Sequence, residues 1–356
     1  MESSDAFETW TANAIARRWR GARAEKIDSL RGDLSTRRFW RARIAAPPSS
    51  GAPRTAIVVD LGPDDLPRYV HALNLLPAPP VEPPWINVHR FFTSIGLPVP
   101  ALYASAVDRR ALLVEDVGEL PLAEAARQPG ADVADLFRLA VEQLLRIHVE
   151  GSRAIDDRCV ARRIEYDGRL FEWELKEFRT IGLAAVAPGA SEASIAPELK
   201  SLAERLNNYP RVLSHRDYHG QNLYLQDGAR IRIIDFQDAL MAPAAQDLAV
   251  LLTTRDTGAI VTPAIEQRIL DFYYTGLIRR DAANLSAGEF TTSYRLCVVQ
   301  HALKMIGRFE MFERSGKRGY AAYIPHARAQ ALRMMKELPQ LFPKLSAALA
   351  NRQDRA

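Results

Sequence analysis

The feature that most limits how this 356-residue chain can fold is the segment SHRDYHGQNLYLQDGARIRIIDFQD, residues 214–238. Two short runs of strand-forming residues, LYLQ and RIRII, flank Asp227-Gly228, a dipeptide typical of a two-residue hairpin turn. With that turn Asn222 faces residue 233, so Asn222 and Asp235 come to the same open end of the hairpin. Facing residues lie about 5 Å apart. Two oxygen-bearing side chains at that separation can share a hard cation such as Mg²⁺, together with phosphate oxygens.

The loop that enters this hairpin has a spacing with a known chemical use. His215-Arg216-Asp217 followed after four residues by Asn222 matches the catalytic loop of protein kinases, where the aspartate orients the attacking hydroxyl and the asparagine binds metal. An aspartate with an ordinary pKa of about 3.9 is a poor base for an alcohol, so we expect Asp217 mainly to aim that oxygen at the phosphate. The alternative is a polar loop whose carboxylates cap helices or accept backbone N–H groups.

Nearby histidines and a second aspartate have structural interpretations. His215 and His219 are four residues apart, but a zinc-binding helix needs glutamate after the first histidine, and Arg216 occupies that position. We expect His215 to bond nearby backbone and shape the loop. Asp247 opens an apolar helix and can cap it or bond the loop around residues 215–217.

The rest of the chain changes character near residue 120. Strand patterns come first and helical patterns dominate afterwards, which predicts a small sheet-rich lobe, a junction near 115–121 and a larger helical lobe containing one hairpin. The expected strands are 37–45, 54–60, 101–107 and 110–118; the expected helices are 84–96, 132–151, 166–183, 198–208 and several after 245; and a loop is expected at 187–194.

Composition excludes several classes of function. The net charge is +4, from 47 basic and 43 acidic residues, which does not favour a nucleic-acid partner. Cys159 and Cys297 form no C-x-x-C pair, so we expect reduced thiols in the cytoplasm rather than zinc or disulfides. Residues 1–26 contain several arginines and no signal-peptide run, which favours a solvated helix face over a membrane-surface helix. No window predicts a transmembrane helix.

Three segments together carry a family resemblance. LLVEDVGELPL, LSHRDYHGQNLYL and RIRIIDFQDALMAPAAQDLAVLL resemble the aminoglycoside phosphotransferase and choline kinase superfamily, which has a protein-kinase-like fold. GDLSTRRFWRARI, LFEWELKEF, IDFQDALMAP and QHALKMIGRFEMFERSGKRGYAAYIP look most like the bacterial anomeric sugar kinases that phosphorylate C1 of N-acetylmuramate and N-acetylglucosamine in cell-wall recycling. The resemblance covers about residues 30–340. It implies an α+β, two-lobed fold, with residues 1–117 as the nucleotide-binding lobe and 118–356 as the catalytic and substrate-binding lobe.

The resemblance also implies roles for individual residues. Asp217 becomes the catalytic aspartate, and Asn222 and Asp235 become the Mg²⁺ ligands. Backbone groups near Glu115 and Val117 would hold adenine at the lobe junction. The nucleotide site expected from the loop GDLSTRR comprises Ser35 and Thr36 as hydrogen-bond donors and Arg37 or Arg38 as phosphate-binding charges.

One departure from the wider superfamily concerns the phosphates. Kinase-like folds carry a strand lysine paired to a helix glutamate, but TAIVVDLG offers Val59 and Asp60, and the helix WINVHRFF has no glutamate. The sugar-kinase branch shows a similar lack. Arg38 or Arg41 are the candidates to replace the missing charge.

The acceptor site is predicted from polar residues near the expected cleft. Glu174, Asp238, Gln300 and Lys304 are the candidate substrate-binding residues. Gln300 and Lys304 share one helix face because they are four residues apart, and Lys304 could meet an anionic group such as a lactyl carboxylate. Trp173 is either a core residue or a ring that stacks on the sugar.

These observations lead to one functional hypothesis with two alternatives. The hypothesis is an ATP- and Mg²⁺-dependent kinase that phosphorylates a small-molecule sugar, at the anomeric hydroxyl of an N-acetyl or amino sugar, with no nucleic-acid or membrane partner. One alternative is an aminoglycoside-type phosphotransferase, which the slightly basic chain disfavours. The other is a catalytically silent nucleotide-binding module, suggested by the missing lysine–glutamate pair. A protein kinase lacks support, because G-x-G-x-x-G is absent and DFQ stands where D-F-G would. The oligomeric state stays open.

Overall fold

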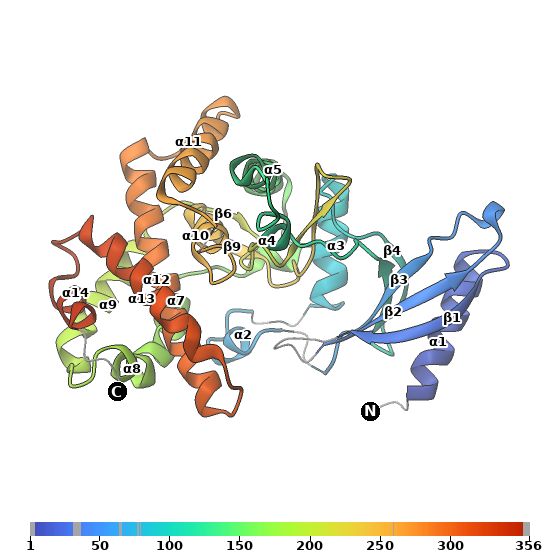
Figure 1. Ribbon diagram of the computed structural model, residues 1–356, viewed down its shortest axis with the longest axis horizontal. Helices are drawn as coiled ribbons and strands as arrows, with labels where there is room; N and C mark the ends of the chain where they lie inside the picture. The colour runs from blue at the N-terminus through green and yellow to red at the C-terminus, as the bar shows by residue number, and fades with distance from the viewer. Residues whose placement is uncertain are drawn as a thin grey trace.

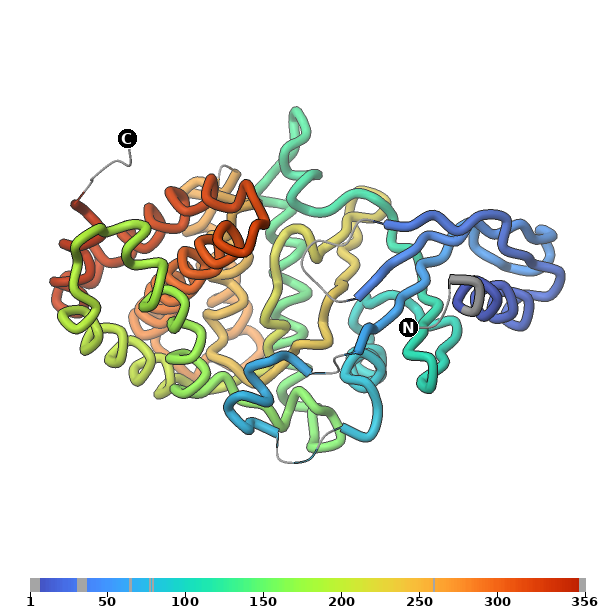
Figure 2. Tube along the Cα trace, turned by 90° about the horizontal axis from the view of Figure 1, so that it is seen from below, coloured from blue at the N-terminus to red at the C-terminus, as the bar shows by residue number. Residues whose placement is uncertain are grey.

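The computed structural model describes residues 4–30, 37–63, 66–76, 78, 80–258 and 260–351. A small part that contains a five-stranded sheet lies beside a larger, mainly helical part (Figure 1). Residues 214–238, yellow in the second view, run where the two parts meet (Figure 2). This arrangement confirms the predicted α+β, two-lobed fold class. The exact division at residue 117 remains a prediction, although the last strand of the sheet ends at Glu115 and the next helix begins at Leu122.

All neighbouring strands of the five-stranded sheet are antiparallel. Its strand order is β1-β2-β3-β5-β4. The strands are β1 (Arg23–Leu30), β2 (Arg38–Ala45), β3 (Thr55–Asp60), β4 (Leu102–Ala106) and β5 (Ala111–Glu115). β2 and β3 form the predicted hairpin, with Phe39 opposite Val59. The sequence pattern does not reveal β1, because this strand pairs only with β2 and none of its side chains is fully buried.

The two faces of the sheet have different neighbours, because successive strand residues point to opposite sides. One face packs against helix α1 (Ser4–Arg18), while Arg17 and Arg18 stay exposed, as the sequence predicts. The buried contact consists of Ala14, Ile15, Trp19, Ala42, Ile44, Ala56, Val58 and Leu113. The other face is turned toward the helical part, with Phe39, Ile57 and Val59 on it. None of the helices in the described ranges combines the length and apolarity needed to span a membrane.

Helix α3 (Pro84–Ser94) links the sheet part to the segment after the hairpin. Its bounds agree with the predicted helix at 84–96, and the chain turns at Gly96 with a φ of 69°. Trp85 and Phe92 both contact Phe236, with ring centroids 5.2 and 5.6 Å apart. The remaining short elements before residue 100 are η1 (Pro48–Ser50) and α2 (Arg68–Ala72).

The helical part is built on one large core that also receives side chains from the sheet part. Its helical segments are α4 (Leu122–Ala125), α5 (Val133–Leu145), η2 (Arg146–Gly151), α6 (Ser152–Ala154), η3 (Val160–Arg163), α7 (Gly168–Glu174), η4 (Phe178–Gly182), α8 (Leu183–Val186), α9 (Glu192–Asn207), α10 (Ala245–Thr253), α11 (Pro263–Arg279), α12 (Ala287–Arg314), η5 (Tyr320–Tyr323), α13 (Ile324–Lys336) and α14 (Pro343–Ala350). α5 begins where the Asp132 side chain accepts a hydrogen bond from the backbone N–H of Asp135. Its apolar side chains, including Phe137, Val141 and Leu144, are buried.

Two expected segments are wrong in detail. The single helix predicted for 166–183 is divided into α7, η4 and α8. The interruption coincides with a close contact to α12, where a Cβ on Gly182 would lie 2.9 Å from Cα of Gly307. The loop predicted for 187–194 is too long, because α9 already begins at Glu192 and accommodates Pro197 in its first turns. The first error arises because packing overrides local sequence preference.

The hairpin at the centre of the sequence argument forms, with a register one residue away from the prediction. β7 (Leu223–Gln226) and β8 (Arg230–Ile233) pair so that Gln226 faces Arg230, which adds Ala229 to the connection. Asp227 and Gly228 both have positive φ, 48° and 72°. Asn222 is therefore not opposite residue 233; its carbonyl instead accepts the N–H of Ile234 at 3.0 Å. The open end still brings Asn222 and Asp235 together.

A second pair of short strands fixes the loops on either side of this hairpin. β6 (Arg211–Ser214) pairs with β9 (Leu240–Pro243), and Ser214 faces Leu240. The segment that follows β6 and the segment that precedes β9 therefore start and end side by side. This pairing delivers Asp217 and Asp235 to one region although 18 positions separate them in the sequence.

Candidate active site

A cavity of about 1080 Å³ lies between the sheet and the helical part. Its lining includes side chains from the sheet, from the 215–238 segment, and from α12 and α13. The volume is at the upper end of the range typical of ligand sites, about 300–1,000 Å³. Of the predicted site residues, the lining includes Glu115, Val117, Asp217, Asn222, Asp235, Asp238 and Lys304.

Asp247 fixes the loop that carries Asp217. The buried carboxylate of Asp247 accepts the backbone N–H groups of His215 and Arg216, each at 2.8 Å, and Nε2 of His148 lies 2.9 Å away. His215 Nε2 lies 3.0 Å from the carbonyl oxygen of Ile234. Arg216 has a φ of 76°, a conformation that costs energy outside glycine and is stabilised here by these bonds. The structural interpretations of His215 and Asp247 are therefore confirmed.

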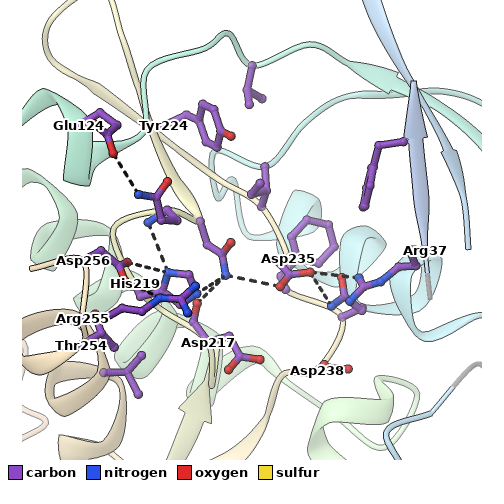
Figure 3. A pocket seen from close by; sticks show the side chains of 18 of the residues that line it. Arg37, Glu124, Asp217, His219, Tyr224, Asp235, Asp238, Thr254, Arg255 and Asp256 are labelled. Atoms are coloured by element: carbon purple, nitrogen blue, oxygen red, sulfur yellow. Dashed lines mark hydrogen bonds and ion pairs between the residues drawn. The ribbon is translucent and has the colours of Figure 1, made fainter. Parts of the chain in front are cut away.

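Asp217, Asn222 and Asp235 lie together at one side of the cavity. Nδ2 of Asn222 lies 2.9 Å from the Asp217 carbonyl oxygen and 3.4 Å from Oδ2 of Asp235. Figure 3 shows Asp217, Asp235 and Asp238 around one space, with Arg37 entering from the sheet side. Asp235 has a φ of 62°. Asp217, Asn222 and Asp235 thus lie together as the sequence predicts, despite the shifted register of the hairpin.

The charge state of Asp217 depends on opposing effects. Burial raises the pKa of its carboxyl group, but the positive charges of Arg216 and Lys304 outweigh burial and hold that pKa below its ordinary value. Asp217 is therefore ionised at neutral pH. An ionised carboxylate can accept a hydrogen bond from a hydroxyl group, but it is a weak base toward an alcohol.

Among the arginines of its segment, Arg37 is the one that contacts Asp235, one of the two predicted Mg²⁺ ligands. Its NH1 lies 3.1 Å from Oδ1 of Asp235, which also accepts a hydrogen bond from Nε2 of Gln237 at 3.0 Å. Residues 37, 39 and 41 face the cavity, as strand alternation requires. Arg38 points to the other face, is exposed, and pairs with Asp60 at 2.6 Å, so the structure does not bring Arg38 to the site. Ser35 and Thr36 lie outside the described residues.

The sheet side of the cavity is apolar. At its edge lies the junction between the two parts, residues 115–121, which is called the hinge below. The apolar lining of the cavity includes Leu30, Phe39, Ile57, Val59, Trp85, Pro100, Val114 and Ile234. The carbonyl of Val117 accepts a hydrogen bond from Gln226 at 3.2 Å. The Glu115 carboxylate accepts hydrogen bonds from both terminal nitrogens of Arg232, at 2.7 and 2.5 Å.

The positions of the missing lysine and glutamate are filled by apolar and aromatic residues. Ile57 and Val59 of β3 face the cavity, and Trp85 stacks on His89 within α3. Arg41 lines the cavity too, but its Nε lies 2.7 Å from Asp116 and it also pairs with Glu119. Arg41 is thus paired with two acidic residues near the end of β5, whereas Arg37 pairs with Asp235.

The four predicted acceptor residues separate into two groups. Asp238 and Lys304 line the cavity, whereas Glu174 and Gln300 are buried behind it. Glu174 bonds Arg216 and Lys304, each at 2.9 Å, and also accepts a hydrogen bond from the Tyr166 hydroxyl. Gln300 lies 3.3 Å from Glu174 in the same network. Trp173 packs partly buried against the core, which favours its structural interpretation.

Asp238 differs from the other carboxylates of the site. Burial raises its pKa to about 6, and Arg216 opposes this effect while Asp217 adds to it. Arg216 NH1 lies 3.9 Å from the Asp238 carboxylate, and its guanidinium lies 4.3 Å above the ring of Tyr69. Asp238 is ionised near neutral pH and becomes protonated in mildly acidic solution.

Comparison with known families agrees with this geometry. The model of the phosphotransferase enzyme family matches residues 45–282, more than half of the chain. The chain belongs to this family. As a member of the family it is a phosphotransferase, which confirms the predicted enzyme class and the resemblance on which the prediction depended.

Curated relatives of this phosphotransferase have a shared name. The N-acetylmuramate/N-acetylglucosamine kinase of Caulobacter vibrioides is 30% identical over 257 residues, which cover 68% of this chain and 65% of that protein. The protein of the same name from Pseudomonas putida is 28% identical over 284 residues, which cover 76% of this chain and 79% of that protein.

Solved structures share the fold of this phosphotransferase. Choline kinase LicA from Streptococcus pneumoniae superposes with a TM-score of 0.55 at 17% identity, over 94% of this chain and 99% of that one. LicA in complex with AMP gives a TM-score of 0.56 at 16% identity, over 96% and 100%. These similarities confirm the two-lobed, protein-kinase-like fold.

Several lining residues of the phosphotransferase escaped the sequence argument. His219 Nδ1 lies 3.3 Å from Asp256, and its Nε2 lies 3.2 Å from Nδ2 of Asn222. His301 and Arg308 line the cavity beside Lys304. The helix period offered a signal for these two, because they lie three residues before and four residues after Lys304 and so share its face. Nothing in the local sequence marks Asp256.

Proposed function

We propose that this chain transfers the γ-phosphate of ATP, with Mg²⁺ as cofactor, to the anomeric hydroxyl of an N-acetyl sugar. The observation that carries the proposal is the grouping of Asp217, Asn222 and Asp235 on one side of a cavity that also has an apolar slot and a polar helical wall. The shared name of the curated relatives supports an N-acetyl sugar as acceptor.

The nucleotide base fits the sheet side of the cavity. A flat aromatic base needs apolar walls on both faces, and Phe39, Val59 and Val114 supply such surfaces. Backbone groups of residues 115–117 lie at the edge of this slot, where a base presents its hydrogen-bonding atoms. The AMP complex of the structurally similar LicA supports a nucleotide ligand.

The residues near Asp235 fit a magnesium ion by the chemistry of their atoms. Asp235 supplies a carboxylate and Asn222 a side-chain oxygen, and Mg²⁺ commonly binds one or two protein oxygens together with phosphate oxygens and water. Within the described ranges no cluster of three or more His, Cys, Asp or Glu side chains could hold a metal by itself, so the phosphates would complete the coordination. When bound, the ion would neutralise charge on the phosphates.

Arg37 is proposed to bind the phosphates in place of the missing strand lysine. Its side chain is 18% exposed and its guanidinium lies 3.1 Å from Asp235, hence at the place where the metal and the phosphates would meet. An arginine can bind phosphate oxygens through two parallel hydrogen bonds. This contact would stabilise the negative charge that the transferring group carries.

The acceptor hydroxyl is proposed to bind to Asp217. The ionised carboxylate accepts a hydrogen bond from the hydroxyl and directs the oxygen toward the γ-phosphorus. It takes the proton as the new oxygen–phosphorus bond forms and the bond from the γ-phosphorus to the bridging oxygen breaks, which releases ADP. Asp238 and Lys304 extend the same surface and can bond other hydroxyl groups of the sugar. The Asp247 contacts described above hold Asp217 in place during this step.

The experiment is a product analysis. The protein is incubated with Mg²⁺ and ATP and with N-acetylglucosamine, N-acetylmuramate or an aminoglycoside, and ³¹P NMR locates the phosphate. We expect an anomeric phosphate on the N-acetyl sugars, and Asp217→Asn should lower kcat by about 10²–10⁴ without weakening nucleotide binding. Phosphate on an aminoglycoside alone, or ATP binding without any product, would overturn the proposal in favour of one of its alternatives.

A further inference from the structure

One face of α12 forms the wall of the cavity at the acceptor side. His301, Lys304 and Arg308 are spaced three to four residues apart and all line the cavity. Side chains at that spacing lie above one another along a helix. The wall therefore presents two cations, one helical turn apart, to whatever occupies the space next to Asp217.

The two cations differ in how their charge is used. Nζ of Lys304 lies 2.9 Å from the Glu174 carboxylate, and both side chains are buried. Breaking such a pair leaves an uncompensated buried charge, which is costly. Lys304 is therefore committed to Glu174 and is a poor receptor for a second anion.

Arg308 makes no direct contact of this kind, although its positive charge helps to lower the pKa of Glu174. It is half-buried and lines the cavity. Among the residues that the structure describes, none forms a hydrogen bond or an ion pair with its guanidinium group. Arginines that are partly removed from water usually pair with a carboxylate or a carbonyl. A half-buried guanidinium directed into a ligand cavity is thus suited to an anionic group of the ligand.

A second positive charge reinforces this end of the cavity. Arg255 also lines it, on the side of the pocket opposite Arg37 (Figure 3), and its guanidinium lies 4.9 Å from the ring of Tyr323. Nε of Arg255 lies 3.8 Å from Asp256, and that aspartate also pairs with His219.

We propose that Arg308 binds a carboxylate carried by the acceptor sugar and thereby makes this chain prefer an acidic N-acetyl sugar over a neutral one. The inference rests on the proposed sugar-kinase function and deepens it. N-Acetylmuramate and N-acetylglucosamine are matched probes, because they differ by the lactyl ether that carries the carboxylate. The carboxylate would lie one helical turn along α12 from Lys304.

The test compares the two sugars in steady-state kinetics. Arg308→Gln removes the charge and keeps a side chain of similar shape. We expect it to lower kcat/KM for N-acetylmuramate about tenfold or more, mainly through KM, which corresponds to about 1.4 kcal/mol, and to change kcat/KM for N-acetylglucosamine less than about threefold. Arg308→Lys should retain part of the preference. The control is Arg314→Gln, because Arg314 lies on the same helix, is exposed, and pairs with Glu310 at 3.0 Å outside the cavity.

A second readout uses the unmodified protein. Because the contact is between two charges, KM for N-acetylmuramate should rise with potassium chloride concentration while KM for N-acetylglucosamine stays nearly constant. An equal loss on both sugars in Arg308→Gln, or no loss on either, would overturn the role of Arg308 and leave the sugar-kinase function standing. Wild-type protein that phosphorylates neither sugar would overturn the proposed function and this inference together.

Discussion

At the scale of single residues, the carboxylate of Glu174 lies between two buried cations. Arg216 and Lys304 each approach it to 2.9 Å, although the three side chains belong to segments far apart in the sequence. Burial alone would raise the pKa of Glu174, but the two cations outweigh burial and lower it well below its ordinary value. The same group thus positions the arginine beside Asp217 and the lysine of the cavity wall.

Replacing Glu174 by glutamine should destabilise the protein. The change leaves two buried cations without their shared anion, which costs about 3–5 kcal/mol in comparable cases. Urea unfolding measures the loss, and Glu172→Gln is the control, since Glu172 is exposed on the same helix and should change stability by less than about 0.5 kcal/mol. Equal stability of the two variants would contradict the buried network.

The contribution of ionised Glu174 to the free energy of unfolding should also depend on pH. The pKa of Glu174 is lower in the folded than in the unfolded chain, so its contribution is complete above the unfolded value of about 4.3 and is lost as the pH falls. The stability of Glu174→Gln should therefore fall less steeply than that of the wild type below about pH 5. Parallel acid-unfolding curves would argue against this assignment.

Arg37 precedes β2 and Arg38 is its first residue; only Arg37 lines the cavity, which makes the two a matched pair. Arg37→Gln should raise KM for Mg-ATP about tenfold or more, because a charge-assisted contact to phosphate contributes about 1.5–3 kcal/mol. Arg38→Gln should leave KM nearly unchanged, because Arg38 pairs with Asp60 away from the cavity. Steady-state kinetics at saturating sugar decides the matter, and similar effects of the two variants would refute the assignment of Arg37.

At the scale of elements, α12 and η4 meet through glycines. A Cβ on Gly307 would lie 2.3 Å from the backbone nitrogen of Phe178, closer than any real contact, so one element would have to move. This contact fixes the distance between α12, which carries Lys304 and Arg308, and η4. Since η4 follows α7 closely, the same contact also places Glu174, the last residue of α7. The close backbone contact between Gly307 and Phe178 therefore helps to place the face of α12 that lines the cavity.

Gly307→Ala should consequently destabilise the protein by about 3 kcal/mol, the upper range for overpacking at a buried contact. Gly288→Ala on the same helix meets nothing within 4 Å, and alanine favours a helix by up to about 1 kcal/mol over glycine. Differential scanning calorimetry of both variants should thus show opposite shifts in Tm. A destabilised Gly288→Ala together with an unaffected Gly307→Ala would be incompatible with this packing.

At the scale of the whole molecule, the cavity depends on the contacts that hold the sheet part against the helical part. Arg232 of β8 donates to both oxygens of Glu115, at the end of β5, and to the carbonyl oxygens of Pro98 and Val99. The hairpin that delivers Asn222 and Asp235 is thus tied directly to the hinge. A ligand that contacts both parts should stabilise this arrangement as one unit.

Mg²⁺ with ATP should therefore raise the thermal stability of the protein. Binding at one hundred times the dissociation constant adds about 2.7 kcal/mol to the free energy of unfolding. Differential scanning fluorimetry should show a rise in Tm that EDTA reduces and that Asp235→Asn largely removes. Asp227→Asn is the control, because Asp227 is exposed at the hairpin tip. A metal-independent rise of equal size in Asp235→Asn would exclude the proposed role of Asp235.

Much of this molecule follows from local sequence. The hairpin signal at Asp227-Gly228, the spacing from Asp217 to Asn222, and the change from strand to helix patterns near residue 120 depend on neighbouring residues alone. Each reflects backbone preference or side-chain periodicity over a few residues, so they predict the architecture and the grouping of Asp217, Asn222 and Asp235. The one-residue error in register does not change the grouping, because Nδ2 of Asn222 still lies 3.4 Å from Oδ2 of Asp235.

Only the tertiary structure decided which charged residues face the cavity and which are neutralised by a partner. Nothing local distinguishes Arg37 from Arg38 as a phosphate ligand, or Lys304 from Arg308 as an anion receptor. The difference depends on Asp60, on Glu174 and on the strand face that α1 covers, all of which come from distant parts of the chain. Electrostatic interactions act through space, so the partner that neutralises a charge is known only once the chain has folded.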